Sequence, residues 1–350
     1  MQKTPDSGLS RSFMRRVLFV LGLLLLIVLV VQAHRLLLLA FGAVVVAVLL
    51  RTLADPLGRR TPLPGRAAVM VAVVVVLAVL ALSSWLFGRE VADQTVILSE
   101  SLPQAWERVQ ARLGNSALGA RFLDELTRLG GETSQVFAMA PRIAASGAAA
   151  VTNLLLIVVA GIMLAMNPAT YRDGLVMLWP SPLRAQMRDA LDATGRALKL
   201  WLLGQFVSMT VIGLLTGLGL WLVGVPSPLA LGLFAGLAQF VPVVGPLVSA
   251  VPGLILSASE GAQVFLWTLA VYVGVQQIES NLITPFVQKR MVQIPMALTL
   301  FAVVGFGMFF GPLGVLFATP LAVALFVLVK ILYVRDVLGD DVDLAGLSRE

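Results

Sequence analysis

"FVPVVGPLVSAVPG", residues 240–253, places three prolines and two glycines inside a run of apolar residues. Proline has no amide hydrogen and clashes with the preceding helical turn, so an α-helix does not run unbroken through Gly245 and Pro246. About 13 apolar residues lie on each side of this break within segment 229–257, and they cover roughly 20 Å as helix. That is too short to cross a hydrocarbon layer of roughly 30 Å. The stretch therefore predicts two half-length helices that fold back at a tip containing Pro242, Gly245 and Pro246.

A second stretch, "FGMFFGPLGVLFATP" at 306–320, repeats the pattern, because both place Gly-Pro-Leu five residues after a phenylalanine. Gly311 and Pro312 interrupt the apolar segment 296–334, which is longer than one plain span requires. Each interrupted segment follows one ordinary apolar segment, so we expect a helix-plus-hairpin unit twice, in opposite orientations. Interrupted segments in matching halves indicate a transporter site near the bilayer midplane. The alternative is a coincidence between two helices rich in Gly and Pro.

The composition is that of an integral membrane protein. Of the 350 residues, 59% are hydrophobic and 13% charged, with a mean hydropathy of +0.94, whereas soluble domains carry roughly 25% charged residues. Apolar segments with about the length of a membrane-spanning helix, roughly 20 residues, recur along the chain. We count eight: 17–33, 36–54, 67–87, 148–166, 200–223, 229–257, 262–283 and 296–334. The predicted fold is therefore an all-α membrane protein with about eight apolar segments, two of them re-entrant hairpins in an inverted repeat.

The loops complete the predicted domain organisation. Residues 88–147 repeat apolar side chains every three or four positions, which predicts a small external helical insert. "PSPLRAQMRDALDATGRALK", 180–199, predicts an amphipathic helix at the inner membrane surface, with ion pairs of Asp192 to Arg188 and Arg196; a solvated connector is the alternative. The expected parts are three membrane helices in 1–87, the insert 88–147, a fourth helix with its linker in 148–199, helix-plus-hairpin units in 200–257 and 262–334, and a cytoplasmic acidic tail 335–350.

The basic residues predict the orientation, because cytoplasmic loops of membrane proteins carry an excess of Lys and Arg. Residues 1–16 and 51–66 each carry four basic residues against one acid, and 167–199 carry five against three. The segment 284–295 adds Lys and Arg without an acid, whereas the insert 88–147 has six Arg and seven acids. We therefore expect both termini in the cytoplasm and the insert outside.

Three further features at the helix ends bear on the topology. Trp201 and Trp221 stand roughly 30 Å apart along a helix, so they can mark opposite membrane surfaces; simple packing is the alternative.

The basic N-terminus and an apolar run ending "VQAH" also resemble a signal peptide cleaved after Ala33. A second apolar run starts at once at Leu36, which favours a helical hairpin. The single histidine, His34, lies at this junction, and we expect it to be structural.

Glu279 is the unusual acid of the chain. Only Glu260 and Glu279 are acidic between Asp192 and Asp336, and Glu260 lies in the loop sequence "SASEGAQ". Glu279 precedes the basic pair at 289–290 by about ten residues, roughly 15 Å of helix, which is about halfway into the membrane. A charge at the bilayer centre costs about 2.5–3.5 kcal/mol on insertion scales and usually marks an ion or substrate path.

The residues around Glu279 form a polar arc on a helical wheel. Together with the first hairpin they supply the predicted ion- or substrate-binding residues: Glu279, Asn281, Gln276, Gln277, Thr284 and Gln239. We expect this arc to face the protein interior. The alternative is that Glu279 lies near the inner surface as a structural residue, hydrogen-bonded to a hairpin.

These motifs carry a family resemblance. "QQIESNLITPFVQKRMVQIPMAL", "GPLGVLFATPLAV" and "FVPVVGPLVSAVPG" resemble signatures of the AI-2E family of bacterial membrane transporters, also called PerM-like permeases. The resemblance covers nearly the whole chain, although the external insert and the tails match by position only. It implies a homo-oligomer of the bacterial inner membrane, with a pentamer as one candidate assembly, that exports small molecules. Autoinducer-2 is the name-giving substrate and some members exchange sodium for protons, but the substrate varies within the family.

The sequence favours a secondary transporter in which Glu279 binds a proton or a sodium ion. There is no G-x-x-x-x-G-K-[ST] motif, so the energy would come from a gradient. The chain lacks H-E-x-x-H, G-x-S-x-G and cysteine, which argues against an intramembrane enzyme, thiol catalysis and Cys-ligated metal. We expect no cofactor, no bound metal and no nucleic-acid partner; lipid and a small-molecule or ion substrate are the expected partners. A passive oligomeric channel and a non-transporting scaffold are the alternatives.

Overall fold

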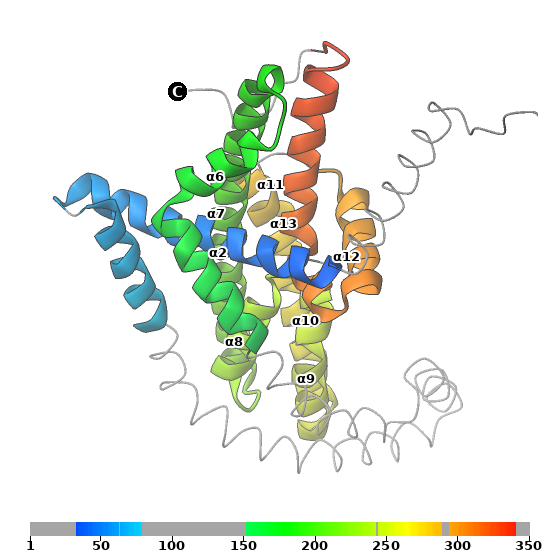
Figure 1. Ribbon diagram of the computed structural model, residues 1–350. Coiled ribbons are helices and arrows are strands. Elements are labelled where there is room, and N and C mark those ends of the chain that lie inside the picture. Colours follow the sequence, from blue (N-terminus) through cyan, green and yellow to red (C-terminus); the bar gives the residue numbers. More distant parts are fainter. Residues whose placement is uncertain (1–32, 63, 79–151, 243, 289–293, 341–350) are drawn as a thin grey trace, which may run out of the picture.

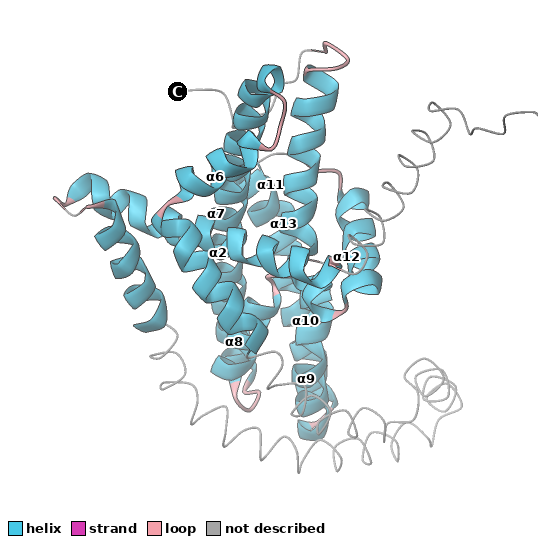
Figure 2. Cartoon of the chain, in the orientation of Figure 1, coloured by secondary structure: helices cyan, strands magenta, loops and turns pink. Residues whose placement is uncertain are grey.

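A computed structural model describes residues 33–62, 64–78, 152–242, 244–288 and 294–340 (Figure 1). Within these ranges the regular elements are all helices and no strand occurs (Figure 2). The predicted all-α class is therefore confirmed for this part of the chain. The first predicted membrane segment, the external insert 88–147 and most of the acidic tail lie outside the described residues.

The described helices follow one another along the chain, and some are joined by a single residue or by a π-helical turn. They are α2 (His34–Arg60), a helix at Gly65–Ala78, a helix at Thr152–Met166, α6 (Pro168–Met177), α7 (Arg184–Val223), α8 (Pro228–Ala238), α9 (Val244–Glu260), α10 (Ala262–Ile278), α11 (Thr284–Gln288), α12 (Met296–Phe310) and α13 (Pro312–Val329). A 3₁₀ turn (Ser181–Leu183) precedes α7, and π-helical turns follow α10 (Glu279–Ile283) and α13 (Lys330–Arg335).

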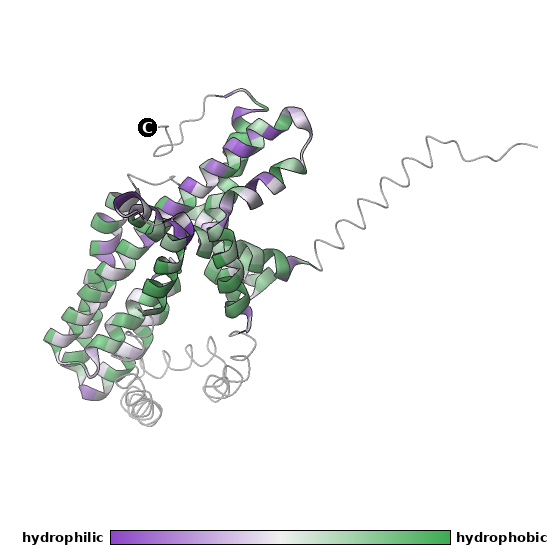
Figure 3. Cartoon of the chain, turned by 60° about the vertical axis from the view of Figure 1, so that its left-hand side comes forward, coloured by the Kyte–Doolittle hydropathy of each residue, from purple (hydrophilic) through white to green (hydrophobic). Residues whose placement is uncertain are grey.

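Several of these helices have the length and composition of membrane spans. Three of the described helices qualify alone, namely α2, the Ser181–Val223 helix and the Pro312–Arg335 helix. A fourth qualifies if Thr152–Met166 and α6, which meet at a 90° bend, form one span. Large apolar side chains are exposed on many of the helices, and apolar residues recur along the helices in Figure 3. These features agree with a multi-pass membrane protein.

The predicted linker and fifth segment form one continuous helix. α7 is 40 residues long, which is roughly 60 Å. The apolar face of its N-terminal part is buried in the protein rather than laid on a bilayer, since Met187, Thr194 and Leu198 pack inside. Protein contacts therefore cover part of the apolar face that predicts a membrane-surface helix, because a protein core and a lipid surface favour the same periodicity.

The predicted ion pairs within the linker are also wrong. Asp192 lies 2.9 Å from Arg172 of α6, and Arg188 lies 3.3 Å from Asp173 of α6. α6 packs beside the N-terminal part of α7, so carboxylates and guanidinium groups that could pair along one helix pair between two helices instead. The ion pairs between the two helices form in preference to pairs within α7, because local pairs at a helix surface contribute only about 0.2–0.5 kcal/mol.

Trp201 does not mark a membrane surface. Its side chain is 5% exposed and its indole meets the ring of Phe240 edge-on, with 5.7 Å between the ring centroids. Phe240 belongs to the turn between α8 and α9, so the indole packs under the tip of the first hairpin. Trp221, in contrast, is 65% exposed, as a residue at an interface would be. The aromatic-belt prediction is thus wrong for Trp201.

The first hairpin consists of α8 and α9, and α8 packs on the C-terminal half of α7 through close backbone contact. A Cβ added to Gly232 would lie 2.6 Å from the Cα atom of Gly217, and one added to Gly236 would lie 2.7 Å from the carbonyl oxygen of Met209. The contact joins two G-x-x-x-G sequences, Gly213 to Gly217 on α7 and Gly232 to Gly236 on α8. Such pairs let helices in membranes approach closely, since small residues leave the backbones in van der Waals contact.

α13 packs on the other half of α7. The buried side chains of Leu198 and Leu202 share a cluster with Val323, Val327 and Ile331 of the C-terminal segment. α2 crosses the long axes of α7 and α13 (Figure 1) and contributes Leu38 and Val45 to the same cluster. The two interrupted segments therefore lie against opposite halves of α7.

The first tip lies earlier in the chain than predicted. α8 ends at Ala238, and Gly245 and Pro246 belong to the first turn of α9, where proline's missing N–H removes no helical bond. Pro242 does lie in the connecting turn. Gly245 has a packing role, because a Cβ there would overlap the carbonyl oxygen of Ala238.

The second break does fall at Gly311 and Pro312. Gly311 joins α12 to α13 with φ +66°, a conformation that costs residues with a Cβ roughly 1–2 kcal/mol. Pro312 is the first residue of α13, the helical position that tolerates proline best. The shared Gly-Pro-Leu motif thus forms a joint in one segment and a helix start in the other.

Candidate ion or substrate site

Glu279 begins a wide turn that separates α10 from α11. The amide of Thr284 donates to the carbonyl oxygen of Glu279, five residues back instead of four. Pro285 accounts for this geometry, because its ring would clash with the carbonyl oxygen of Asn281 in a regular helix. Single π-helical turns of this kind are rare and recur at functional sites.

Three side chains donate hydrogen bonds to the Glu279 carboxylate. Gln239 Nε2 donates to Oε1 at 2.9 Å, Thr284 Oγ1 lies 3.5 Å from the same oxygen, and Gln276 Nε2 donates to Oε2. Gln239 comes from the turn between α8 and α9, whereas the others flank Glu279. The structure thus brings together four of the predicted site residues.

Gln205 belongs to this group although sequence reasoning missed it. Its Nε2 donates to the backbone carbonyl oxygen of Gln239, and its side chain is 8% exposed on α7. The first hairpin tip is therefore held by α7 on one side and by Glu279 on the other. The available signal was a lone glutamine in the apolar run "LWLLGQFVSM", 200–209.

The surroundings of Glu279 carry no compensating charge among the described residues. α7 from Leu200 to Val223, α8 and α11 contain no charged residue, and Glu260 lies at the opposite end of α9 from the first hairpin tip. The described residues also contain no cluster of three or more His, Asp or Glu side chains that could hold a metal. One carboxylate with amide and hydroxyl partners suits a monovalent cation or a proton, because a divalent ion would lack counter-charge.

The predicted polar arc separates into two groups. Asn281 Nδ2 donates to Gln277 Oε1 at 3.1 Å, and both side chains are exposed on the single chain, away from the Glu279 contacts. The wide turn explains the separation, since an extra residue per turn places Thr284 over Glu279 where a regular helix would place Ile283. A wheel drawn at 3.6 residues per turn does not include that shift.

The tip of the second hairpin is not part of this group of contacts. Gly311 and Pro312 make none of the hydrogen bonds to Glu279 described above. Apart from those of α2 and the linker, most buried polar side chains lie on α7, the first hairpin and α10. They include Gln205, Ser208, Thr216, Gln239, Ser249, Ser257 and Thr268. α13 adds Thr319. The polar interior of the described chain thus lies on the side of the first hairpin.

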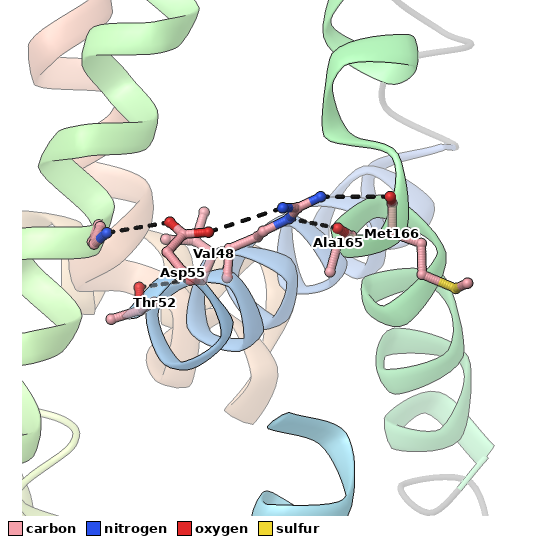
Figure 4. A network of polar contacts seen from close by, with 7 residues as sticks. Val48, Thr52, Asp55, Ala165 and Met166 are labelled. Carbon is pink, nitrogen blue, oxygen red and sulfur yellow. Dashed lines mark hydrogen bonds and ion pairs between the residues drawn. The ribbon is translucent and has the colours of Figure 1, made fainter. Parts of the chain in front are cut away.

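A separate polar network holds the 90° bend of the N-terminal half (Figure 4). Arg51 Nε donates to the carbonyl oxygen of Ala165 at 2.6 Å, and Asp55 lies between Arg51 and Lys199 at 3.9 and 3.4 Å. The guanidinium group satisfies a carbonyl at a helix C-terminus, where cations are favoured. This network joins α2, α7 and the Thr152–Met166 helix, so these basic residues have a structural role.

Comparison with known proteins decides the family. The sequence model described as "AI-2E family transporter" matches residues 17–333. The chain belongs to the AI-2E transporter family. The resemblance of the motifs is thereby confirmed, and the family is described as one of transporters.

Individual relatives match this AI-2E family member over part of their length. A Bacillus subtilis protein named "Putative transport protein YrrI" is 28% identical over 142 residues, which is 41% of this chain and 39% of the relative. "Putative transport protein YueF" from the same organism is 29% identical, again over 41% and 39%. A Thermotoga maritima "Putative transport protein" is 26% identical over 50% of this chain and 54% of its own. The matches therefore span roughly two fifths to one half of these relatives.

Proposed function

We propose that the protein is a secondary transporter that exports a small polar molecule or cation, driven by a proton or sodium gradient. Glu279 is the coupling residue. The observation that carries the proposal is the hydrogen bond between Glu279 and Gln239, because it joins an isolated acid to the turn of an interrupted helix pair. Family membership supports transport, and intramembrane acids that face the protein interior usually mark ion or substrate paths.

The contact supplies a physical route for coupling. An ion can shift a conformational equilibrium only by the difference in its affinity for the two states. Glu279 has different partners according to whether Gln239 lies beside it, so moving the first hairpin changes the affinity of the carboxylate for its ion. Interrupted helices next to such a site are typical of secondary transporters.

The packing of the two interrupted segments on opposite halves of α7 supports the membrane topology that we propose together with this function. The protein has eight membrane segments, with α8–α9 re-entering from the outside and the α12–α13 break reached from the cytoplasm. Both termini are cytoplasmic, and the protein is a homo-oligomer of the bacterial inner membrane. Packing of the two segments on opposite halves of α7 supports entry from opposite sides, although α13 with its following turn is long enough to span alone.

A passive oligomeric pore is the second candidate. It is favoured by one observation, the exposure of Gln277 and Asn281 on the surface of the single chain. Polar side chains at membrane depth do not face lipid without cost, so a water-filled lining would satisfy them. A pore of this kind needs no ionisable group at position 279.

Flux in proteoliposomes separates the two candidates. Full-length protein is reconstituted, and proton movement is read by internal pyranine while pH or sodium gradients are imposed in the presence of small polar solutes, autoinducer-2 among them. We expect gradient-driven flux that Glu279→Gln abolishes and Glu260→Gln, the matched acid at the end of α9, retains. Flux that is independent of the gradient and of Glu279→Gln would identify a pore, and no flux under any condition would favour a scaffold.

A further inference from the structure

The side-chain oxygen of Gln239 is a buried acceptor that lacks a donor. Gln239 is 3% exposed, and its Oε1 has no hydrogen-bond partner among the described residues. Buried polar atoms in proteins are nearly always hydrogen-bonded. An orphaned acceptor next to a carboxylate therefore points to a second state of the site in which this oxygen is used.

The atoms around Glu279 suit an ionised carboxylate without a metal ion. Both carboxylate oxygens accept from side-chain amides, one from Gln239 Nε2 and the other from Gln276 Nε2, and the Thr284 hydroxyl lies near Oε1. Hard cations such as sodium require a shell of oxygen ligands. In the observed arrangement the amides of Gln239 and Gln276 present hydrogens, and not oxygen ligands, to the carboxylate.

We propose that the ion bound at Glu279 is a proton, and that the Gln239 amide turns over when the proton binds. The carboxylate takes a proton from water and becomes a carboxylic acid, so one oxygen changes from acceptor to donor. A half-turn of the amide then presents the orphaned Oε1 to this new O–H group. On release the proton returns to water and the amide turns back.

Gln205 is the positioning residue of this switch. It holds the backbone carbonyl of Gln239 from α7, so the side-chain amide can turn while the tip of the first hairpin stays in place. α7 beyond Leu200, α8 and α11 carry no charged residue that could compete for the proton, and Glu260 of α9 lies at the opposite end of that helix from the tip. The inference deepens the proposed function by choosing between its two coupling ions, and its biological meaning rests on that function.

Infrared difference spectroscopy on full-length protein in liposomes tests the switch without measuring transport. Acidification should produce a carboxylic-acid band, absent in Glu279→Gln, together with a change in a glutamine amide band. Replacing choline chloride with sodium chloride at equal ionic strength should leave both unchanged. Gln239→Leu should shift the acid band and remove the amide change, and Gln205→Leu should broaden both. Gln263→Leu, at an exposed glutamine near the opposite end of α10 from Glu279, should leave both bands as in the wild type.

Three results would overturn the proposal. They are an acid band that disappears when sodium is added, an acid band in the wild type with no accompanying amide change, and an unshifted band in Gln239→Leu. The first two are measured on the wild type once Glu279→Gln has assigned the band, so a poorly folding Gln239 variant does not protect the proposal. A sodium-insensitive acid band in a protein without gradient-driven flux would refute the transport function and leave the switch intact.

Discussion

The side-chain amide of Gln239 donates a 2.9 Å hydrogen bond to the carboxylate of Glu279, 40 residues further along the chain. Gln239 lies in the turn of an interrupted helix pair, and Glu279 begins a π-helical turn. Each feature results from a nearby proline that a regular helix does not accommodate. The bond therefore joins two irregular backbone segments, which is where a moving part would be built.

Gln205→Leu tests whether α7 holds the first hairpin. The substitution removes the donor to the Gln239 carbonyl oxygen and should lower gradient-driven flux, because the tip is no longer fixed opposite Glu279. An unpaired buried carbonyl costs about 1–3 kcal/mol, so a modest loss of thermal stability is also expected. Thr210→Val on the same helix, whose hydroxyl bonds only its own backbone, is the control. Wild-type flux in Gln205→Leu would contradict this role.

Gly232→Leu tests the contact between α7 and α8. The new side chain would collide with the backbone of Gly213 and Gly217, and we expect a destabilisation of roughly 1–3 kcal/mol, as for overpacked cores. The measurement is thermal unfolding in detergent. Gly274→Leu on α10, where an added Cβ meets nothing within 4 Å, should unfold near the wild-type temperature. Equal unfolding temperatures for the two variants would refute the close packing.

Gly311→Ala tests the joint between α12 and α13. Its φ of +66° is strained for alanine, so we expect a loss of roughly 1–2 kcal/mol although there is open space for the methyl group. Gly305→Ala within α12, which has no such φ and the same open space, should be neutral or slightly stabilising, since alanine favours helix. Thermal unfolding of the pair separates backbone strain from packing. A neutral Gly311→Ala would mean that the joint relaxes.

Arg51→Met tests the network at the 90° bend. It removes the donor to the Ala165 carbonyl oxygen and one partner of Asp55 while keeping the aliphatic stem. We expect a destabilisation of about 1–3 kcal/mol from the unpaired groups. Arg59→Met in the last turn of the same helix is the matched control, expected to change stability by less than about 0.5 kcal/mol. A smaller effect at Arg51 than at Arg59 would show that the bend does not need this residue.

Cysteine labelling tests whether the two hairpin tips are accessible from opposite sides of the membrane. The chain has no native cysteine, so labelling reports on the introduced cysteine alone. Val241→Cys in the first tip and Pro312→Cys in the second are treated with a membrane-impermeant maleimide in oriented vesicles. We expect the first to label from the outside and the second from the cytoplasm. Leu222→Cys and Leu338→Cys, both well exposed at the ends of their segments, calibrate the two sides. Labelling of both tips from one side only would contradict the inverted arrangement.

The amino-acid sequence by itself determined the features that depend on each residue alone or on its immediate neighbours. Hydropathy predicts membrane helices because the cost of burying a side chain in lipid depends on its own chemistry. Proline lacks an amide wherever it occurs, so the interruptions near residues 242–246 and at 311–312 were predictable within a few residues. Glu279 stood out for the same reason, as an acid in a segment with almost no other charge, and the family motifs are short local patterns.

The tertiary structure alone decided which side chains meet. Trp201 packs under Phe240 instead of facing a membrane surface, and Asp192 pairs with Arg172 of another helix. Gln205 joins the site because packing of glycines on α7 and α8 brings the hairpin tip to it. The wide turn at Glu279 rotates the residues after it, so Thr284 takes part and Asn281 does not. These outcomes depend on contacts between residues far apart in the chain, whose energies exceed the local preferences that a sequence pattern expresses.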